Sequence, residues 1–165
     1  MTQVTTYYLE MKSLSQLKES SESKGLNVDE VQVKQYQVNK FLYQFVGESW
    51  GWLDKLSWTN EQWEEYSGKD NLRTWLASYK GSPAGYYELE QSDDGSTEIA
   101  YFGLTPNFIG KGFGGFLLSE AIKSAWAWDD TKRVWVHTCT LDHPSAMVNY
   151  QSRGMEIYHE ETHDR

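Results

Sequence analysis

The chain has 165 residues, a length that suits one domain with a proper core and leaves little room for two. Its formal net charge of -9 argues against nucleic acid as the main partner, because phosphate binding needs a clustered basic surface. An acidic surface would favour a cationic partner such as an amine, or serve solubility alone. The single cysteine, Cys139, excludes an intramolecular disulfide and a multi-cysteine metal site, and we expect no metal.

Residues 1–10 have neither the basic start nor the apolar run of a secretory signal. No apolar stretch approaches the roughly 18 residues of a membrane-spanning helix, so we expect a cytoplasmic protein with no membrane partner. Residues 5–11 are rich in β-branched and aromatic side chains and predict a first strand. The polar stretch 12–30 predicts a loop with a short helix, and the alternation in residues 31–37 predicts a half-exposed strand.

Two helices are predicted next, separated by an irregular segment rich in tryptophan. Asn39 is expected to cap a helix that ends at Gly47. Thr59 is expected to begin a short helix through Trp63. Three tryptophans lie between these helices: Trp50, Trp52 and Trp58.

The remaining elements follow from turn residues and helical spacing. Strands are predicted at residues 72–79, 84–90 and 97–104, and glycine-containing turns make them an antiparallel meander. A helix is predicted at 112–128, a strand at 133–138, a helix at 143–153 and a last strand at 155–161. With no internal repeat and no linker, we expect one domain over residues 1–165.

Residues 110–115 (GKGFGG) carry the most informative signal. Four glycines in six residues allow a sharp turn and close approach to a bulky anion. Free N–H groups in the first turn of the following helix would bind phosphate oxygens, and Lys111 adds a positive charge. The run therefore predicts a ligand that carries phosphate.

Two common phosphate loops fit poorly. A Walker loop needs Ser or Thr after its Gly-Lys, whereas Lys111 is followed by Gly112. The dinucleotide fingerprint is matched formally by Gly110, Gly112 and Gly115, but it lies late in the chain and lacks an early parallel β–α–β unit. A nicotinamide-dependent oxidoreductase is therefore the weakest alternative.

The run resembles the acetyl-CoA loop of the GCN5-related N-acetyltransferase (GNAT) family, which reads Gln or Arg, two residues, Gly, one residue, then Gly or Ala. Gly112 and Gly114 take the two small positions, and Ile109 stands where Gln or Arg is usual. A second motif, Tyr, three residues, Gly and an apolar residue, is matched by Tyr150 and Gly154.

Around this second motif, Ala146 precedes the tyrosine by four residues, as is common in the family, and His143 stands where Asn is frequent. The resemblance covers about residues 72–161. It implies an α+β GNAT fold, with a mixed, mostly antiparallel sheet of six or seven strands flanked by about four helices. It also implies an N-acetyltransferase that moves the acetyl group of acetyl-CoA directly to a primary amine of a small molecule or peptide.

The resemblance further implies where acetyl-CoA binds. The pantetheine arm is expected to pair with the backbone of Phe102, Gly103 and Leu104 in a slot between two splayed strands. The other expected cofactor-binding residues are Ile109, Gly110, Lys111, Gly112, Phe113, Gly114, Gly115 and Asn149.

Three residues are candidates for proton transfer. Glu98 is similar in position to a glutamate that serves as base in family members, and His137 is the alternative base because its ordinary pKa of about 6.5 suits the task. The resemblance places Tyr150 near the thioester sulfur, where its hydroxyl can protonate the departing thiolate.

The acceptor site is expected in the tryptophan-rich segment. Trp50, Trp52 and His137 are the expected substrate-binding residues, although His137 faces either the cleft or the core depending on register. Phe45, Trp58 and Glu48 could complete an aromatic, acidic pocket for a cation, or the rings could belong to the core. The departures at Ile109 and His143 leave open a catalytically silent acyl-CoA-binding or regulatory module on the same fold. The many tryptophans are also compatible with a homodimer.

Overall fold

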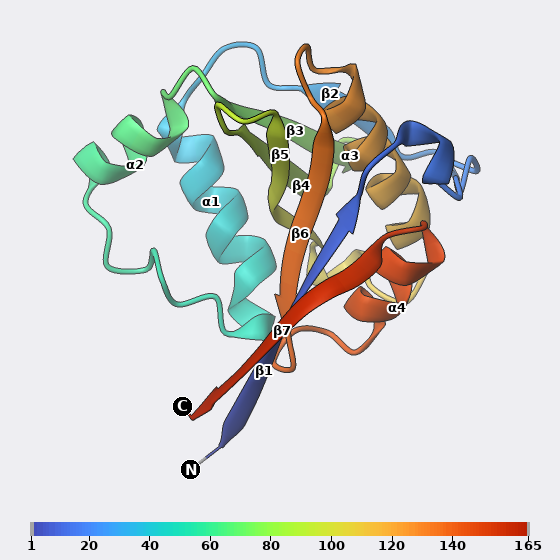
Figure 1. Cartoon of the computed structure of the whole chain (residues 1–165). Helices are drawn as coiled ribbons and strands as arrows, with labels where there is room; N and C mark the ends of the chain where they lie inside the picture. Colours follow the sequence, from blue (N-terminus) through green and yellow to red (C-terminus); the bar gives the residue numbers. More distant parts are fainter. Residues whose placement is uncertain (1, 165) are drawn as a thin grey trace.

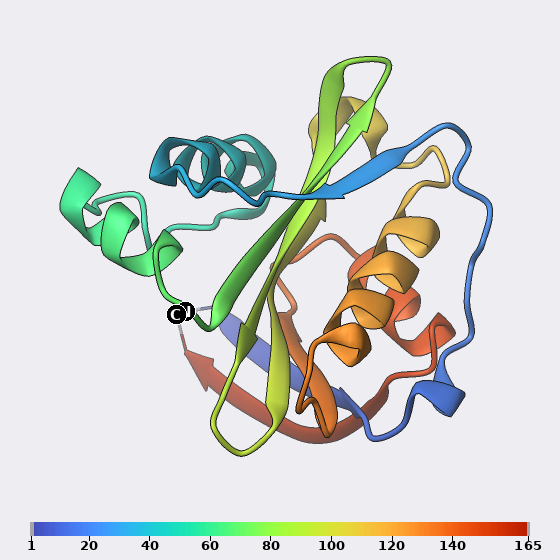
Figure 2. The same cartoon turned by 90° about the horizontal axis from the view of Figure 1, so that it is seen from above.

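A seven-stranded sheet with helices on both faces forms the protein (Figures 1 and 2). The computed structural model describes residues 2–164 of the predicted 1–165 domain. The strand order is β2-β3-β4-β5-β6-β1-β7, and β5–β6 is the parallel pair. The strands are β1 Gln3–Met11, β2 Asn27–Glu30, β3 Leu72–Tyr79, β4 Ser82–Gln91, β5 Ser96–Leu104, β6 Arg133–Cys139 and β7 Glu156–Asp164. The α-helices are α1 Tyr36–Gly47, α2 Asn60–Ser67, α3 Gly114–Ala127 and α4 Ser145–Ser152, and short 3-10 turns lie at Leu14–Gln16, Glu48–Trp50 and Pro106–Phe108.

The predicted meander β3-β4-β5 and the predicted ending β–α–β–α–β are both confirmed. The helix start at Thr59 is also confirmed. Its hydroxyl accepts a hydrogen bond from the Gln62 N–H, and the Gln62 side chain accepts one from the Thr59 N–H. Within residues 2–164 there is no helix with the length and apolar character required to cross a membrane.

The predicted strand at residues 31–37 is wrong, and so is the predicted capping role of Asn39. The strand lies earlier, at β2, and α1 already begins at Tyr36. Asn39 is inside α1 and buried, where its amide donates to Thr74 Oγ1 at 2.9 Å and to Glu88 Oε2 at 2.7 Å. The apolar residues that set this segment are spaced by four, as a helix requires; they are Val38, Leu42 and Val46.

The two faces of the sheet carry separate apolar clusters. The larger lies under α3 and α4 and includes Leu9, Leu117 and Ile122. The smaller lies under α1 and includes Val46 and Tyr86. Figure 2 shows α1 and α2 on one side of the sheet and α3 and α4 on the other.

A β-bulge in β5 changes which side chains face each cluster. Leu89 of β4 pairs with Ile99, but the preceding Glu88 pairs with Tyr101, so Ala100 is an extra residue. Ile99 consequently packs in the cluster under α3, whereas Tyr101 packs against the cluster under α1.

The parallel pairing of β5 and β6 is short. Ser96, Thr97 and Glu98 pair with residues 133–135 of β6, and the pairing then ends. Past this point β5 continues to pair with β4 up to Leu104. The opposite backbone edge of β5 therefore has no strand beside it and faces the space between β5 and β6.

We expect Gly154→Ala to destabilise the fold by about 3 kcal/mol, because both conformation and space there require glycine. Gly154 has a φ of +104°, and a Cβ would collide with the Gln16 carbonyl oxygen. The matched control is Gly81→Ala, where φ is +85° but nothing lies within 4 Å of a Cβ, so about 1 kcal/mol is expected. Urea unfolding measures both. Equal losses would show that the contact with Gln16 is unimportant.

Candidate active site

A cavity of about 910 Å³ opens where β5 and β6 diverge. Residues 99–104 of β5 form one wall, and Val136, His137 and Cys139 of β6 form the opposite one. The glycine run and α4 close one end, and residues 50–54 line the other. Elements from both halves of the chain therefore meet around one space.

The glycine run presents backbone donors to this cavity. Gly110 and Gly112 have φ values of +78° and +86°, and both line the cavity together with Gly114 and Gly115. Helix α3 begins at Gly114, and among the described residues no side chain caps its N-terminus. Its first N–H groups and the positive end of its dipole are thus available to an anion. The Asn149 amide donates to the Gly114 carbonyl at 3.0 Å and ties α4 to this loop.

Two cations beside the run were missed by the sequence analysis. A Cβ on Gly112 would collide with the Lys24 ammonium, and a Cβ on Gly115 would lie 3.4 Å from Arg153 Nη1. Arg153 lines the cavity, and its buried Nε has no hydrogen-bond partner among residues 2–164. Arg153 directly precedes the glycine of the second motif, which was an available signal; Lys24 lies in the polar stretch and gave none.

The structure brings most of the expected cofactor-binding residues to the cavity, but not all of them. Phe102, Gly103, Leu104, Ile109, Gly110, Gly112, Gly114, Gly115 and Asn149 line it. Lys111 is exposed and outside the lining. The Phe113 side chain is buried against Tyr79 and Phe108, with ring centroids 5.6 and 5.7 Å away. Helical spacing places it in the core.

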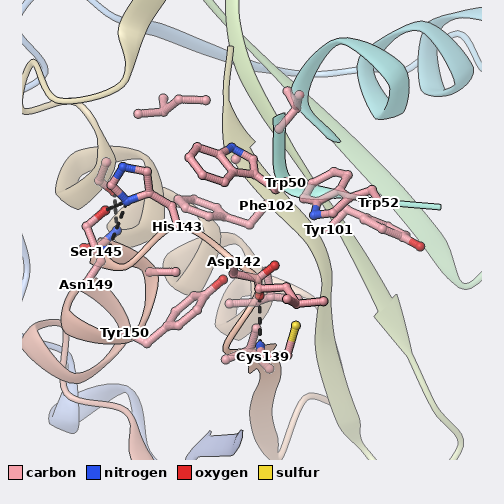
Figure 3. Close-up of a pocket in the computed structure, with 18 of the residues that line it drawn as sticks. Trp50, Trp52, Tyr101, Phe102, Cys139, Asp142, His143, Ser145, Asn149 and Tyr150 are labelled. Atoms are coloured by element: carbon pink, nitrogen blue, oxygen red, sulfur yellow. Dashed lines mark hydrogen bonds between the residues drawn. The ribbon is translucent and has the colours of Figure 1, made fainter. Parts of the chain in front are cut away.

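Tyr150 projects from α4 into the middle of the cavity (Figure 3). It is 6 % exposed, and its ring centroid lies 6.3 Å from that of Phe102. Burial raises the pKa of Tyr150 above its ordinary value, and the negative charge of Asp142 adds to this. The hydroxyl is therefore protonated at neutral pH, as a proton donor must be.

Asp142 and His143, which both line the cavity, stabilise the turn before α4 through hydrogen bonds. Asp142 Oδ2 accepts from Thr138 Oγ1 at 2.5 Å and from the Cys139 N–H at 3.0 Å. His143 Nδ1 accepts from the Ser145 N–H at 3.0 Å, so the imidazole caps the start of α4. Trp50 contacts His143 edge-on, with ring centroids 4.8 Å apart (Figure 3).

The two candidate bases lie side by side. His137 Nε2 is 3.6 Å from Glu98 Oε2, and His137 lines the cavity whereas Glu98 lies outside the lining. Burial raises the pKa of Glu98 to about 7, the charge of Glu90 adds to this, and Lys55 partly opposes it. Burial lowers the pKa of His137. Glu98 can therefore exchange a proton near neutral pH, and His137 is unprotonated there.

The tryptophan-rich segment divides between cavity and core. Trp50 and Trp52 line the cavity, and Trp52 packs against Tyr101 with centroids 5.1 Å apart. Phe45 instead contacts Phe41 on α1, and Trp58 packs on α2; neither they nor Glu48 belong to the cavity lining.

A model of the acetyltransferase (GNAT) family matches residues 36–155. The chain belongs to this family. Solved structures agree in fold. A GCN5-related N-acetyltransferase from Sphaerobacter thermophilus has a TM-score of 0.74 at 14 % identity, over 95 % of this chain and 49 % of that one. One from Kribbella flavida has a TM-score of 0.67 at 16 % identity, over 93 % and 54 %.

The chain thus spans about half the length of these two GNAT proteins. An aminoglycoside acetyltransferase from an uncultured soil metagenomic sample, in complex with trehalose, has a TM-score of 0.65 at 13 % identity, over 79 % of this chain and 88 % of that one. No curated protein matches the sequence.

The Glu98 carboxyl should titrate with a midpoint near pH 7, because burial and Glu90 disfavour its charged form. Below that pH it is protonated and cannot act as a base; above it the base is ready. Carbon-13 NMR of labelled glutamate carboxyls measures the midpoint, and Glu98→Gln assigns the resonance by removing it. A midpoint near the ordinary 4.5 would contradict the environment described here.

Proposed function

We propose that this GNAT protein transfers the acetyl group of acetyl-CoA to a primary amine of a small molecule or peptide. Membership of the acetyltransferase family supports the reaction class. The observation that carries the proposal is that one cavity is lined by the glycine run, Tyr150 and His137, with Glu98 beside His137 outside the lining.

The residues at the glycine end fit a pyrophosphate. The uncapped start of α3 offers N–H donors, and Lys24 and Arg153 supply the positive charge that Ile109 does not. The partnerless Nε of Arg153 is a donor that an anion in the cavity would satisfy. Ile109 is therefore compatible with cofactor binding.

The pantetheine arm would lie along Phe102, Gly103 and Leu104, whose backbone edge faces away from β4. An extended chain there adds to the sheet as an extra strand would. Acetyl-CoA supplies the activated thioester carbonyl, and the protein supplies position and proton transfer.

In the proposed reaction the amine nitrogen forms a bond to the thioester carbonyl carbon, and the carbon–sulfur bond breaks. An alkylammonium ion, with a pKa of about 10, must first lose a proton. We assign that proton to the His137–Glu98 pair, with His137 on the cavity side. Tyr150 gives its hydroxyl proton to the departing sulfur, since burial keeps the phenol protonated until then. The second proton, which the nitrogen loses as the amide forms, returns to the Tyr150 oxygen and restores the phenol.

The acidic balance of the chain, with a net charge of -9, favours a cationic acceptor. One protein of similar fold is an aminoglycoside acetyltransferase, solved also in complex with sisomicin. That likeness supports an amine as the class of acceptor for this chain.

A catalytically silent acyl-CoA-binding module is the second candidate. Ile109 and His143 favour it, because both depart from the motifs of the family, and His143 is engaged in capping α4. The experiment below separates the two candidates.

Tyr150→Phe and Glu98→Gln should each lower kcat about 100-fold, with little change in the KM for acetyl-CoA, because each removes a proton-transfer group. Free thiol released from acetyl-CoA in the presence of an amine panel gives the rate. Tyr36→Phe, which removes a phenol hydroxyl at the start of α1 away from the cavity, is the matched control and should leave kcat unchanged. Undiminished turnover in both active-site variants would refute the assigned roles, and no turnover with any amine would favour the silent module.

A further inference from the structure

Lys55 inserts its ammonium group into a cage of three aromatic rings. Nζ lies 4.7 Å from the ring centroid of Trp58, 5.0 Å from that of Tyr66 and 4.7 Å from that of Tyr101. It also donates to the Tyr101 hydroxyl at 2.7 Å. We call these three rings the ammonium cage. A cation over several ring faces is the arrangement in which proteins bind ammonium ligands.

Carboxylates lie beneath this cage on the α1 face of β4 and β5. Glu88 is 1 % exposed, and its Oε1 accepts from the Tyr66 hydroxyl at 2.6 Å. Burial lowers the pKa of Lys55, and the negative charges of Glu88, Glu90 and Glu98 oppose this without cancelling it. These carboxylates therefore offset part of the cost of taking an ammonium group out of water.

A second polar group in the same region lacks a partner. The Tyr86 hydroxyl is fully buried, and no hydrogen-bond partner for it is found in residues 2–164. Burial raises the pKa of Tyr86, and the charges of Glu88 and Tyr101 add to this. A buried unpaired hydroxyl is unfavourable, and Tyr86 lies in the same apolar cluster as Tyr101 of the ammonium cage.

The ammonium cage adjoins the active-site cavity. Tyr101 belongs to both, because its ring contacts Lys55 and also lines the cavity beside Trp52 (Figure 3). Residues 50–54 line the cavity and lead directly to Lys55 along the chain. Withdrawal of Lys55 would thus leave a vacant cation site at the cavity wall.

We propose that the ammonium cage binds a primary ammonium group of the acceptor, and that Lys55 fills it as an internal substitute that the acceptor displaces. This inference rests on the proposed function and names its substrate class, an alkylammonium with an apolar stem. A side chain needed only to pack the segment between α1 and α2 would not require a charge. Here the occupant is itself a primary ammonium, with one of its three donors used.

The substitute lowers the apparent affinity for the acceptor by the fraction of time that the cage is vacant. Lys55→Met removes the ammonium group and keeps an unbranched apolar stem that is one atom shorter. In calorimetry without acetyl-CoA, it should bind n-butylammonium about tenfold more tightly than the wild type does. Neutral n-butanol should show no such gain.

Two matched variants isolate the effect. Lys55→Arg keeps a cation in the ammonium cage, and Lys40→Met removes the same charge on α1, where Lys40 contacts Asn60 outside the cage. Both should bind n-butylammonium as the wild type does. Lys55→Met binding no tighter than Lys40→Met would overturn the proposal.

A measurement on the wild type keeps the test valid if Lys55→Met does not fold. In protein labelled with carbon-13 at the lysine ε position, the Lys55 resonance, assigned by its loss in Lys55→Arg, should be shifted upfield by the three rings. Saturation with n-butylammonium should move it to the solvent position, and a resonance that stays in place would refute displacement. Neither measurement requires turnover. The proposal of ammonium binding in the cage can therefore be refuted while the acetyltransferase proposal stands, and the acetyltransferase proposal can be refuted while ammonium binding stands.

Discussion

The divergence of β5 from β6 is the constraint on which the rest of the site depends. The two strands pair over three residues of each, and the cavity opens immediately beyond the last pair, Glu98 with Trp135. A sheet that continued to pair would satisfy its own backbone groups and leave no space. Because pairing stops, residues 100–104 keep an open edge, and buried backbone groups there need another partner. In the proposed complex that partner is the pantetheine arm.

The bulge at Ala100 lets one strand serve both halves of the proposed reaction. On a regular strand, residues three apart face opposite sides of the sheet. Because Ala100 is an extra residue, Glu98 before the bulge and Tyr101 after it both face the α1 side. Phe102 then faces Tyr150 on the opposite side. The acceptor-side groups and the cofactor-side groups are thus arranged around one extra residue.

Elements with local signals were predictable from the sequence. Turn residues set the meander, and the capping box at Thr59 is a contact within four residues of chain. The prediction failed where tertiary contacts outweigh local pattern. Asn39 is a good cap by type, yet it is buried inside α1 because Glu88 and Thr74 offer it hydrogen bonds. The apolar alternation at residues 31–37 was too short to specify a strand.

The candidate site likewise contains residues that a local motif predicts and residues that only the fold brings together. The glycine run and Tyr150 were found because each lies in a compact motif. Lys24 and Arg153 approach the run from segments far apart in the sequence, and nothing local indicates their meeting. The ammonium cage likewise joins residues 55, 58 and 66 to Tyr101 of β5. Such contacts depend on how α2 and its preceding loop pack on the sheet.

A crystal structure of the protein with acetyl-CoA would test the central claim most directly. We expect the pyrophosphate against the backbone N–H groups of residues 110–115, with the Arg153 guanidinium in contact. The pantetheine arm should lie along Phe102, Gly103 and Leu104, and the Tyr150 hydroxyl should be the closest donor to the thioester sulfur. Acetyl-CoA bound away from the glycine run, or β5 and β6 found closed against each other, would contradict it.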